Sequence, residues 1–321
     1  MEYILLVIGF VLLIEGANIF VDGASGVAKL LKIPTLVIGL TIVAIGTSLP
    51  ELMVSVIAGL KGNSDIAISN VVGSNLFNLL IVCGICAMIR PLPIGERTLK
   101  NEFPFSIVAT IIAMFLAGDY LLHGKHAINV ISRLDGGILL VLFVLFFVQT
   151  IRYALGHQAE YAEEEDEKKE YTAKDTIKYI VFILGGMIAI KYGGDIVVDE
   201  ASAIARNFGI SQNIIGLTVV AFGTSLPELV TSIIAVKKGE TDMAIGNVIG
   251  SNIFNVLLIL GVASVVRPIS VDISSIYNMI LLNVVSIIVW VCAFAQKKVS
   301  RLVGCGMVSV YIVYMVYVCM H

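Results

Sequence analysis

The chain alternates between long apolar blocks and short polar segments. Most blocks hold about 18 residues or more, the length that carries a helix across a bilayer. This pattern is typical of an all-α polytopic membrane protein. We predict ten transmembrane helices with the approximate bounds 3–21, 33–59, 65–88, 103–118, 135–153, 175–195, 210–236, 242–266, 276–295 and 301–319. The first three residues carry no positive charge, so we expect the first block to be a retained helix and not a signal peptide.

Composition supports the same class of protein. Apolar residues make up 58% of the 321 residues and charged residues only 14%, and the mean hydropathy is +0.97. A soluble globular domain carries about 25% charged residues, so a soluble domain and a disordered chain are both excluded. The net charge of −3 offers no basic surface to a nucleic acid. The expected partner is the lipid bilayer of the cell (plasma) membrane.

Basic residues predict the orientation, because cytoplasmic loops are enriched in Lys and Arg. With the N-terminus outside, the inner loops hold 15 of the 21 basic residues and the outer side holds 6. We therefore predict that both termini lie outside and that the acidic segment 156–174 lies in the cytoplasm. This segment is interpreted as a solvated linker between two five-helix units, 1–155 and 175–321, and not as a Ca²⁺ sensor.

The two units are copies of one sequence at a fixed offset of 177 residues. GLTIVAIGTSLPEL at 39–52 recurs as GLTVVAFGTSLPEL at 216–229, and NVVGSNLFNLL at 70–80 recurs as NVIGSNIFNVL at 247–257. Across 37–91, 32 of 55 positions are identical to their partners. Each copy has an odd number of spans, so the second enters the membrane from the opposite side. Inverted repeats indicate an alternating-access transporter with its site near the midplane. A duplicated scaffold without a transport role would not explain why the best-matched stretches are polar.

Pro50 and Pro227 lie inside two of the apolar blocks. Proline has no N–H, so the carbonyl four residues earlier loses its helical donor. We expect the helix to open around residues 44–47, and around Gly223 in the second copy. A freed carbonyl in a bilayer needs another partner, and a bound cation is one such partner. A plain proline kink is the alternative.

Glu51 and Glu228 directly follow these prolines. A carboxylate near the centre of a span costs roughly 2.5–3.5 kcal/mol on insertion scales, so a pair in symmetric positions needs an explanation. Each glutamate has Thr and Ser hydroxyls beside it, and oxygen ligands of this kind suit hard cations. We expect the two carboxylates to converge on one central site.

The third and eighth spans are expected to form the opposing wall of that site. Ser74 and Asn78 are four residues apart and share a helix face, and Ser251 and Asn255 repeat the arrangement. Four further asparagines are interpreted as hydrogen-bonding groups between helices: Asn70, Asn75, Asn247 and Asn252. Two glycines are expected to allow close helix approach: Gly73 and Gly250.

Other chemistries lack the residues they need. All four histidines fall in predicted loops or at the terminus, and neither an H-E-x-x-H motif nor a P-loop lysine motif is present. Cys83 and Cys86 match C-x-x-C inside an apolar block, where packing is the simpler explanation. We predict no enzymatic activity, no cofactor and no obligate protein partner.

GTSLPEL followed by GSNxFN, present twice, resembles the α-repeats of the sodium/calcium exchanger family, within the calcium/cation antiporter superfamily. The resemblance covers both halves and implies a prokaryotic exchanger, whose first and sixth spans slide against the core. It implies that Ca²⁺ binds Glu51 and Glu228 with the carbonyls of Thr47 and Thr224. The implied Na⁺ ligands are Ala44, Ser48, Ser74, Ala221, Ser225 and Ser251, with Asn78 and Asn255 in the middle of the site.

Many family members carry Asp at one of the two middle positions, whereas this chain has Asn78 and Asn255. The core then holds two carboxylates, which one Ca²⁺ or two Na⁺ would balance. We predict exchange of three Na⁺ for one Ca²⁺ without K⁺ dependence, the third Na⁺ being held by neutral flanking oxygens. An H⁺/Ca²⁺ exchanger is the alternative. A channel fits the inverted repeat less well, and a membrane enzyme lacks a catalytic constellation.

Overall fold

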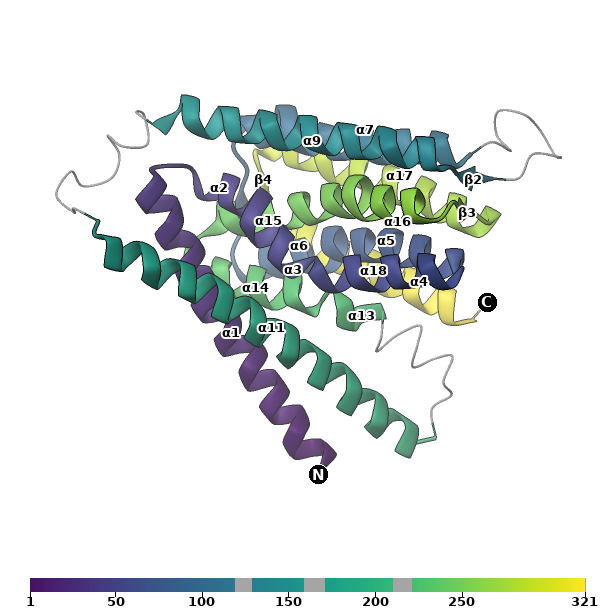
Figure 1. Cartoon of the computed structure of the whole chain (residues 1–321), viewed down its shortest axis with the longest axis horizontal. Coiled ribbons are helices and arrows are strands. Elements are labelled where there is room, and N and C mark those ends of the chain that lie inside the picture. Colours follow the sequence, from purple (N-terminus) through teal and green to yellow (C-terminus); the bar gives the residue numbers. More distant parts are fainter. Residues whose placement is uncertain (119–128, 159–170, 210–220, 321) are drawn as a thin grey trace.

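The computed structural model describes residues 1–118, 129–158, 171–209 and 221–320 (Figure 1), and this part of the chain is helical apart from four two-residue strands. The helices of the first repeat are α1 (Glu2–Leu31), α2 (Thr35–Ile38), η1 (Gly39–Val43), α3 (Ala44–Thr47), α4 (Leu49–Lys61), α5 (Ser64–Phe77), η2 (Asn78–Val82), α6 (Cys83–Ile89), η3 (Thr98–Glu102), α7 (Phe103–Ala117) and α9 (Arg133–Gly156). Segments marked η are π-helical turns that continue the helices beside them.

The second repeat follows the same order. Its described helices are α11 (Ala173–Asn207), α13 (Ala221–Thr224), α14 (Leu226–Lys237), α15 (Thr241–Ile253), η5 (Phe254–Ile259), α16 (Leu260–Val266), α17 (Ile273–Gln296) and α18 (Arg301–Met320). The middle of the predicted linker 156–174 lies outside the described residues.

Eight helices in the described part are long and apolar enough to cross a membrane. A ninth is present if the bent pair Thr35–Thr47 and Leu49–Lys61 counts as one span. The predicted seventh span begins at residues 210–220, outside the described residues, and its described part is α13 with α14. The all-helical class is confirmed, while the count of ten and the orientation of the termini stay predictions.

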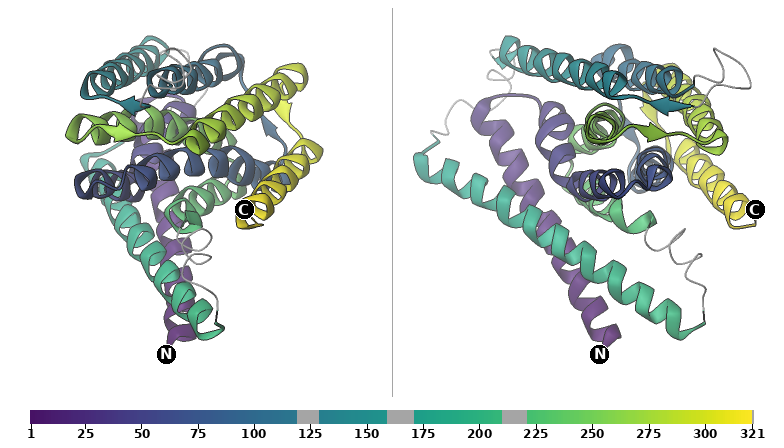
Figure 2. Two further views of the ribbon diagram at one scale, coloured as in Figure 1. Left: turned by 90° about the vertical axis from the view of Figure 1, so that its right-hand side faces the viewer. Right: turned by 45° about the vertical axis from the view of Figure 1, so that its right-hand side comes forward.

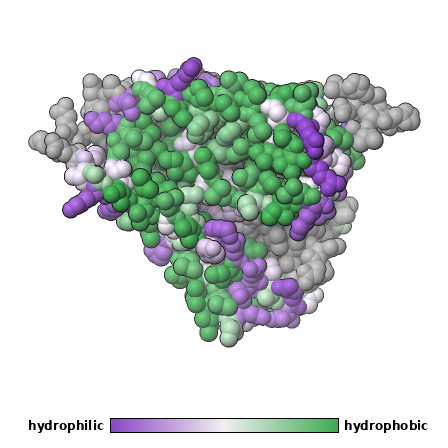
Figure 3. All heavy atoms as spheres, viewed as in Figure 1, coloured by the Kyte–Doolittle hydropathy of each residue, from purple (hydrophilic) through white to green (hydrophobic). Residues whose placement is uncertain are grey.

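The outer surface is apolar over a broad area. Hydrophobic residues cover most of the broad upper part of the face shown in Figure 3, and hydrophilic residues gather toward its left and right margins and along the narrow lower part. On α9, Val141, Val144 and Leu145 are each more than half exposed. Neighbouring exposed apolar side chains of this kind would be unfavourable in water, and they indicate contact with lipid.

The helices α1 and α11 are longer than predicted. They hold 30 and 35 residues, whereas the predicted spans 3–21 and 175–195 end at polar positions such as Asp22 and Asp195, through which the helices continue. At about 1.5 Å per residue they measure roughly 45 and 52 Å, more than the ~30 Å hydrocarbon core. Tilting accommodates such an excess. Figures 1 and 2 show the two helices side by side, running obliquely to the others.

Glycines bring α1 and α11 into backbone contact. A Cβ at Gly16 would lie 2.8 Å from the nearest atom of α11, and a Cβ at Gly193 would lie 2.6 Å from the nearest atom of α1. Gly9 and Gly186 meet the opposite helix almost as closely, at 2.9 and 2.7 Å. The four glycines are two pairs at the repeat offset of 177. Small residues of this kind allow close packing of membrane helices.

The second span breaks at Ser48, one residue later than predicted. The helix on either side of Ser48 changes direction by 49°, and Ser48 has φ −86° and ψ 7°. Ser225 separates α13 from α14 with nearly the same angles, −97° and 6°. Residues 44–47 stay helical because Pro50 falls in the first turn of α4, where a helix needs no N–H donor.

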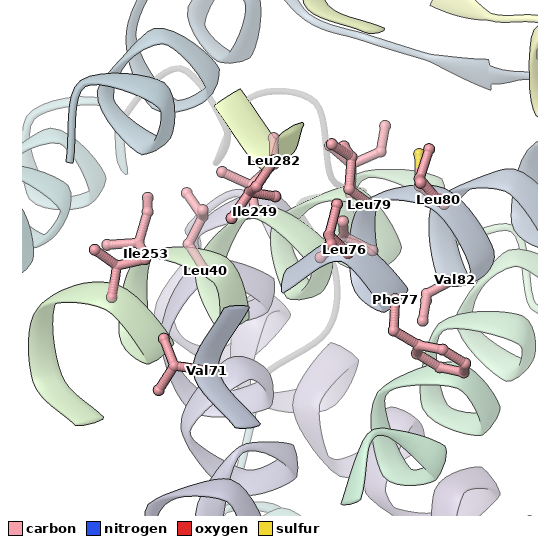
Figure 4. Packing of buried hydrophobic residues seen from close by; sticks show 14 of the residues in the cluster. Leu40, Val71, Leu76, Phe77, Leu79, Leu80, Val82, Ile249, Ile253 and Leu282 are labelled. Carbon is pink, nitrogen blue, oxygen red and sulfur yellow. The ribbon is translucent and has the colours of Figure 1, made fainter. Parts of the chain in front are cut away.

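The two repeats share one core. α9 packs against α16, α6 packs against α18, and α1 packs against α11. Two antiparallel pairs of short strands also join the repeats, β1 (Leu92–Pro93) with β4 (Lys298–Val299) and β2 (Val130–Ile131) with β3 (Ile269–Ser270). Figure 4 shows part of the core, in which Leu40 of η1 lies beside Ile249 and Ile253 of α15. Close packing of this kind positions the polar residues described below.

Gly250 allows α15 to cross η1 and α3 closely, as predicted. A Cβ added at Gly250 would lie 2.8 Å from the Cβ of Ala44 and 2.9 Å from the Cα of Leu40. A Cβ added at Gly73 meets no described atom within 4 Å, so no close approach is seen there. The counterparts of the residues that press on Gly250 fall at 217–221, mostly outside the described residues.

The Lys and Arg distribution gives a testable orientation. We expect a cysteine engineered at 160–170 to react with a membrane-impermeant maleimide only in permeabilised cells, because this segment is predicted to be cytoplasmic. A cysteine at 123–126 should react in intact cells. Both segments lie outside the described residues. The native cysteines would be replaced by serine in both variants, and the reverse labelling pattern would contradict the predicted orientation.

Candidate functional site

Two glutamates lie at the centre of the polar core. Glu51 and Glu228 are in the first turns of α4 and α14, directly after the two helix breaks. Both side chains are 0% exposed. The N-terminus of a helix carries unbonded N–H groups and a partial positive charge. The breaks therefore place both carboxylates where the helix dipole favours negative charge.

Each glutamate is bound by a serine of the other repeat. Ser48 Oγ donates a hydrogen bond of 2.9 Å to Glu228 Oε1, and Ser225 Oγ donates one of 3.2 Å to Glu51 Oε1. Ser225 Oγ also lies 3.1 Å from Ser74 Oγ. Because Ser48 precedes Glu51 by only three residues, the two exchanged hydrogen bonds bring both carboxylates into one site, as the sequence predicted.

Two asparagines, from α5 and α15, hydrogen-bond to the helices that follow the breaks. Asn70 Nδ2 donates to the Glu51 carbonyl at 3.2 Å and to Ser55 Oγ at 2.9 Å. Asn247 repeats this arrangement with the Glu228 carbonyl at 3.5 Å and Ser232 Oγ at 3.0 Å. Sequence reasoning missed both serines, although their identity in the two copies was a usable signal.

The threonines of the breaks extend these contacts across the repeats. Thr47 Oγ1 donates to Asn247 Oδ1 at 3.1 Å, and Thr224 Oγ1 donates to Asn70 Oδ1 at 3.5 Å. Both threonine hydroxyls therefore hydrogen-bond across the repeats. The backbone carbonyls of Thr47 and Thr224 stay the predicted Ca²⁺ ligands of these residues.

The helices α5 and α15 cross at a pair of asparagines. Asn75 Nδ2 donates to the Asn252 carbonyl at 3.2 Å, and Asn252 Nδ2 donates to the Asn75 carbonyl at 3.4 Å. Together with the bonds of Asn70 and Asn247, these contacts confirm that all four asparagines connect helices. They fix the wall that carries Asn78 and Asn255, which are both 0% exposed.

Several buried polar atoms at this site have no hydrogen-bond partner in the described part of the protein. They are Glu51 Oε2, Glu228 Oε2, Asn78 Oδ1 and Nδ2, Asn255 Oδ1 and Ser251 Oγ. A buried polar atom without a partner is costly, and one partly bonded carboxylate is costlier still. Five of the six atoms are oxygens, so the set offers a cation the ligands that Na⁺ and Ca²⁺ accept.

The remaining predicted ligands lie in the same region. Ala44 is buried in α3, and its carbonyl accepts the backbone N–H of Ser48 at 3.0 Å. Ala221 is the first residue of α13, and its side chain is outside the described set. No group of three or more His, Cys, Asp or Glu side chains gathers in the described ranges. An ion here would therefore rely on two carboxylates and neutral oxygens.

Two sequence repeats that share a buried, oxygen-lined site among long apolar helices are typical of a membrane transporter for cations. The chain belongs to the sodium/calcium exchanger family, because the model of the sodium/calcium exchanger protein family matches residues 1–152 and 178–320. Membership of this family makes the chain an ion exchanger rather than an enzyme. Its long apolar helices make it a multi-pass protein of the cell membrane.

Individual relatives and a solved structure are similar to this chain over most of its length. The putative antiporter CaxA of Alkalimonas amylolytica is 36% identical, with 97% of this chain and 96% of that protein covered. The inner membrane protein YrbG of Escherichia coli (strain K12) is 37% identical, with 84% and 81% covered. A solved structure of the sodium-calcium exchanger NCX_Mj matches with a TM-score of 0.84 at 30% identity, with 99% and 98% covered.

Proposed function

We propose that this protein exchanges Na⁺ for Ca²⁺ by alternating access and that both ions use Glu51 and Glu228 in turn. The observation that carries the proposal is the pair of fully buried carboxylates, each with one oxygen bonded across the repeats and one oxygen that has no partner within the described ranges. Two negative charges in a low-dielectric site require cationic compensation, which one Ca²⁺ or two Na⁺ would supply.

The carbonyls of Thr47 and Thr224 complete the proposed Ca²⁺ site. Ca²⁺ accepts six to eight oxygens in irregular geometry, whereas Mg²⁺ demands a tight octahedron and keeps its waters. A site assembled from two carboxylates, carbonyls and amides at two helix breaks therefore suits Ca²⁺, and we expect Mg²⁺ to be a poor substrate.

The neutral flanks support a ratio of three Na⁺ to one Ca²⁺. Neutral oxygens flank both carboxylates: Ser74 Oγ and Ser225 Oγ lie 3.1 Å apart beside Glu51, and Ser48 Oγ lies 2.9 Å from Glu228. The grouping that the repeats suggest, Ser48 with Ser74 and Ser225 with Ser251, is therefore wrong, because Ser74 contacts the serine of the opposite repeat. A third Na⁺ at such a flank would add one net positive charge, so each cycle would move one charge across the membrane. Asn78 and Asn255 add no third carboxylate, which favours exchange without K⁺.

An H⁺/Ca²⁺ exchanger is the second candidate. Complete burial of Glu51 and Glu228 favours it, because a buried carboxylate that releases Ca²⁺ can be neutralised by a proton as well as by Na⁺. Counter-ion identity is therefore the property that separates the two candidates.

Ca²⁺ uptake into proteoliposomes distinguishes the two counter-ions. Liposomes loaded with Na⁺ and diluted into Na⁺-free buffer with ⁴⁵Ca²⁺ should take up Ca²⁺, because Na⁺ leaving the lumen drives its entry. Liposomes with K⁺ on both sides and only a pH gradient should match protein-free liposomes. Uptake driven by the pH gradient alone would favour the H⁺ candidate and contradict the Na⁺ assignment.

A further inference from the structure

The twofold pseudosymmetry of the site fails at its two middle asparagines. Asn255 Nδ2 donates a 3.0 Å hydrogen bond to Asn75 Oδ1. Among the described residues, its counterpart Asn78 has no hydrogen-bond partner at either Nδ2 or Oδ1, and Asn252 Oδ1, the counterpart of the Asn75 acceptor, has none either. Identical GSNxFN motifs thus form different hydrogen bonds in the two repeats.

This difference fixes the orientation of one amide and not of the other. An asparagine has a donor end and an acceptor end. Asn75 Oδ1 engages the donor end of Asn255, and the buried oxygen of Asn255 has no hydrogen-bond partner among the residues that the structure describes. Asn78 lacks such a constraint and can present its oxygen to a cation or its Nδ2 group to a carboxylate.

We propose that Asn75 is a positioning residue that holds Asn255 with its oxygen available to the transported cation. Asn255, from the second repeat, is then oriented in advance as an oxygen ligand. Asn78, from the first repeat, can turn either its oxygen or its amide toward the ion or carboxylate beside it. This inference rests on the proposed exchange at Glu51 and Glu228. It adds that the two repeats contribute unequally to the middle of the site.

The matched variants Asn75→Ala and Asn252→Ala test the role of Asn75. Each removes one side-chain bond to a backbone carbonyl on the opposite helix, at 3.2 or 3.4 Å, but only Asn75→Ala also removes the acceptor of Asn255. We expect Asn75→Ala to raise the KM for Ca²⁺ about tenfold, as loss of one buried hydrogen bond does. Asn252→Ala also loses a buried hydrogen bond, but not the one that orients Asn255, so we expect its KM to rise several-fold less than that of Asn75→Ala, and both variants to melt at similar temperatures.

A second comparison separates positioning from general disturbance. In an Asn255→Asp background both side-chain oxygens of residue 255 are acceptors, so Asn75 no longer has an amide to orient. Adding Asn75→Ala there should change the KM by less than about threefold. An equal KM for Asn75→Ala and Asn252→Ala, or a tenfold penalty that persists in the Asn255→Asp background, would overturn the inference. Failure of the proposed function would appear in other measurements, as Ca²⁺ flux left intact by glutamine at position 51 or 228 or as uptake driven by a pH gradient alone.

A separate observation concerns how one end of α1 is anchored. Lys238, at the end of α14, donates to Asp22 Oδ1 at 2.6 Å and to the Asn18 carbonyl at 2.9 Å. Ser25 donates to Glu240 at 2.5 Å. These contacts join α1 to the turn between α14 and α15, at the end of the molecule that the basic residues assign to the cytoplasm.

The counterpart contacts in the other repeat are not formed in the described residues. The offset of 177 relates Asp22 to Asp199, Lys238 to Lys61 and Ser25 to Ser202. Asp199 and Lys61 form no ion pair in the described part of the chain, and Ser202 Oγ is buried without a hydrogen-bond partner. In the described residues, the α1 end is therefore joined to the turn after α14, while Asp199 and Ser202 of α11 form no equivalent contact.

We infer that these residues form two latches, Asp22 with Lys238 and Asp199 with Lys61, that close in alternation. In an inverted-repeat transporter the second conformation arises when the two repeats exchange geometries. The contacts of α1 would then open and those of α11 would form. Ion pairs with partly exposed side chains contribute little energy, which suits contacts that must release in every cycle. This inference rests on alternating access and is independent of the transported ion.

Cysteine cross-linking tests the two latches in a background whose native cysteines are serine. A short, reducible bis-methanethiosulfonate linker is used, because a direct disulfide needs Cα atoms within about 7 Å and a lysine side chain reaches further than a cysteine does. We expect Asp22→Cys with Lys238→Cys, and separately Asp199→Cys with Lys61→Cys, to cross-link and to stop Ca²⁺ exchange until a reductant is added. A protein carrying all four substitutions should form either cross-link but not both in one molecule. Single-cysteine variants are the controls. Failure of the Asp199–Lys61 pair to cross-link under any ion condition, exchange that continues after cross-linking, or both cross-links in one molecule would each overturn the inference.

Discussion

Replacing Glu51 or Glu228 by glutamine is expected to abolish Ca²⁺ exchange while leaving membrane insertion intact. Glutamine keeps the size of the side chain and an acceptor for Ser225 or Ser48, but it removes half of the negative charge of the site. Removing one partner of a buried charge pair costs about 3–5 kcal/mol, which corresponds to a loss of roughly hundredfold or more at 1.4 kcal/mol per factor of ten. ⁴⁵Ca²⁺ flux in proteoliposomes measures the loss.

Glu96→Gln is the matched control for these variants. Glu96 is an exposed glutamate that accepts a hydrogen bond from Lys100 at 2.9 Å, and this lysine holds the pKa of the Glu96 carboxyl below its usual value. Its replacement should leave Ca²⁺ flux unchanged. Near-normal flux in Glu51→Gln or Glu228→Gln would mean that the two carboxylates do not share the transported ion.

The second large effect is expected at Gly250, where α15 crosses the broken second span. Gly250→Ala would place a Cβ 2.8 Å from the Cβ of Ala44 and 2.9 Å from the backbone of Leu40. Backbone atoms cannot turn aside as a flexible side chain can, and overpacking typically costs about 1–3 kcal/mol. Because Ala44 lies one turn before Ser48, any shift also moves the hydrogen bond to Glu228. We expect a melting temperature lower by roughly 2–8 °C and reduced Ca²⁺ flux.

Gly306→Ala is the control, since Gly306 lies on an exposed face of α18 and an added Cβ there meets no described atom within 4 Å. Its melting temperature and flux in the same detergent and liposomes should match those of the parent. Equal losses in both variants would show that the effect at Gly250 does not come from the close crossing.

The repeat made much of this site predictable from sequence. Two copies of GTSLPE inside apolar blocks indicated that Glu51 and Glu228 face one centre, and the structure brings them together through Ser48 and Ser225. Pro50 predicted the position of the helix break to within one residue. A proline, which has no N–H, fits best in the first turn of a helix and so marks where a new helix begins.

Other features depended on contacts that no single segment encodes. The lengths of α1 and α11 were underestimated because a hydropathy run ends at Asp22 or Asp195, whereas the helix continues through these residues. The sequence also could not say that each serine binds the glutamate of the opposite copy. The unequal bonding of Asn78 and Asn255 lies further out of reach, since their motifs are identical and only packing separates them.

Ca²⁺ distribution at a fixed voltage tests the central claim of Na⁺-coupled, charge-moving exchange most directly. Proteoliposomes would hold equal Na⁺ on both sides and a potential of about 59 mV, at which one elementary charge corresponds to a tenfold ratio. Three-for-one exchange predicts that Ca²⁺ leaves the negative compartment until the ratio is about tenfold, and that this redistribution stops when Na⁺ is removed. Accumulation of Ca²⁺ on the negative side, an unchanged ratio, or redistribution without Na⁺ would contradict the account.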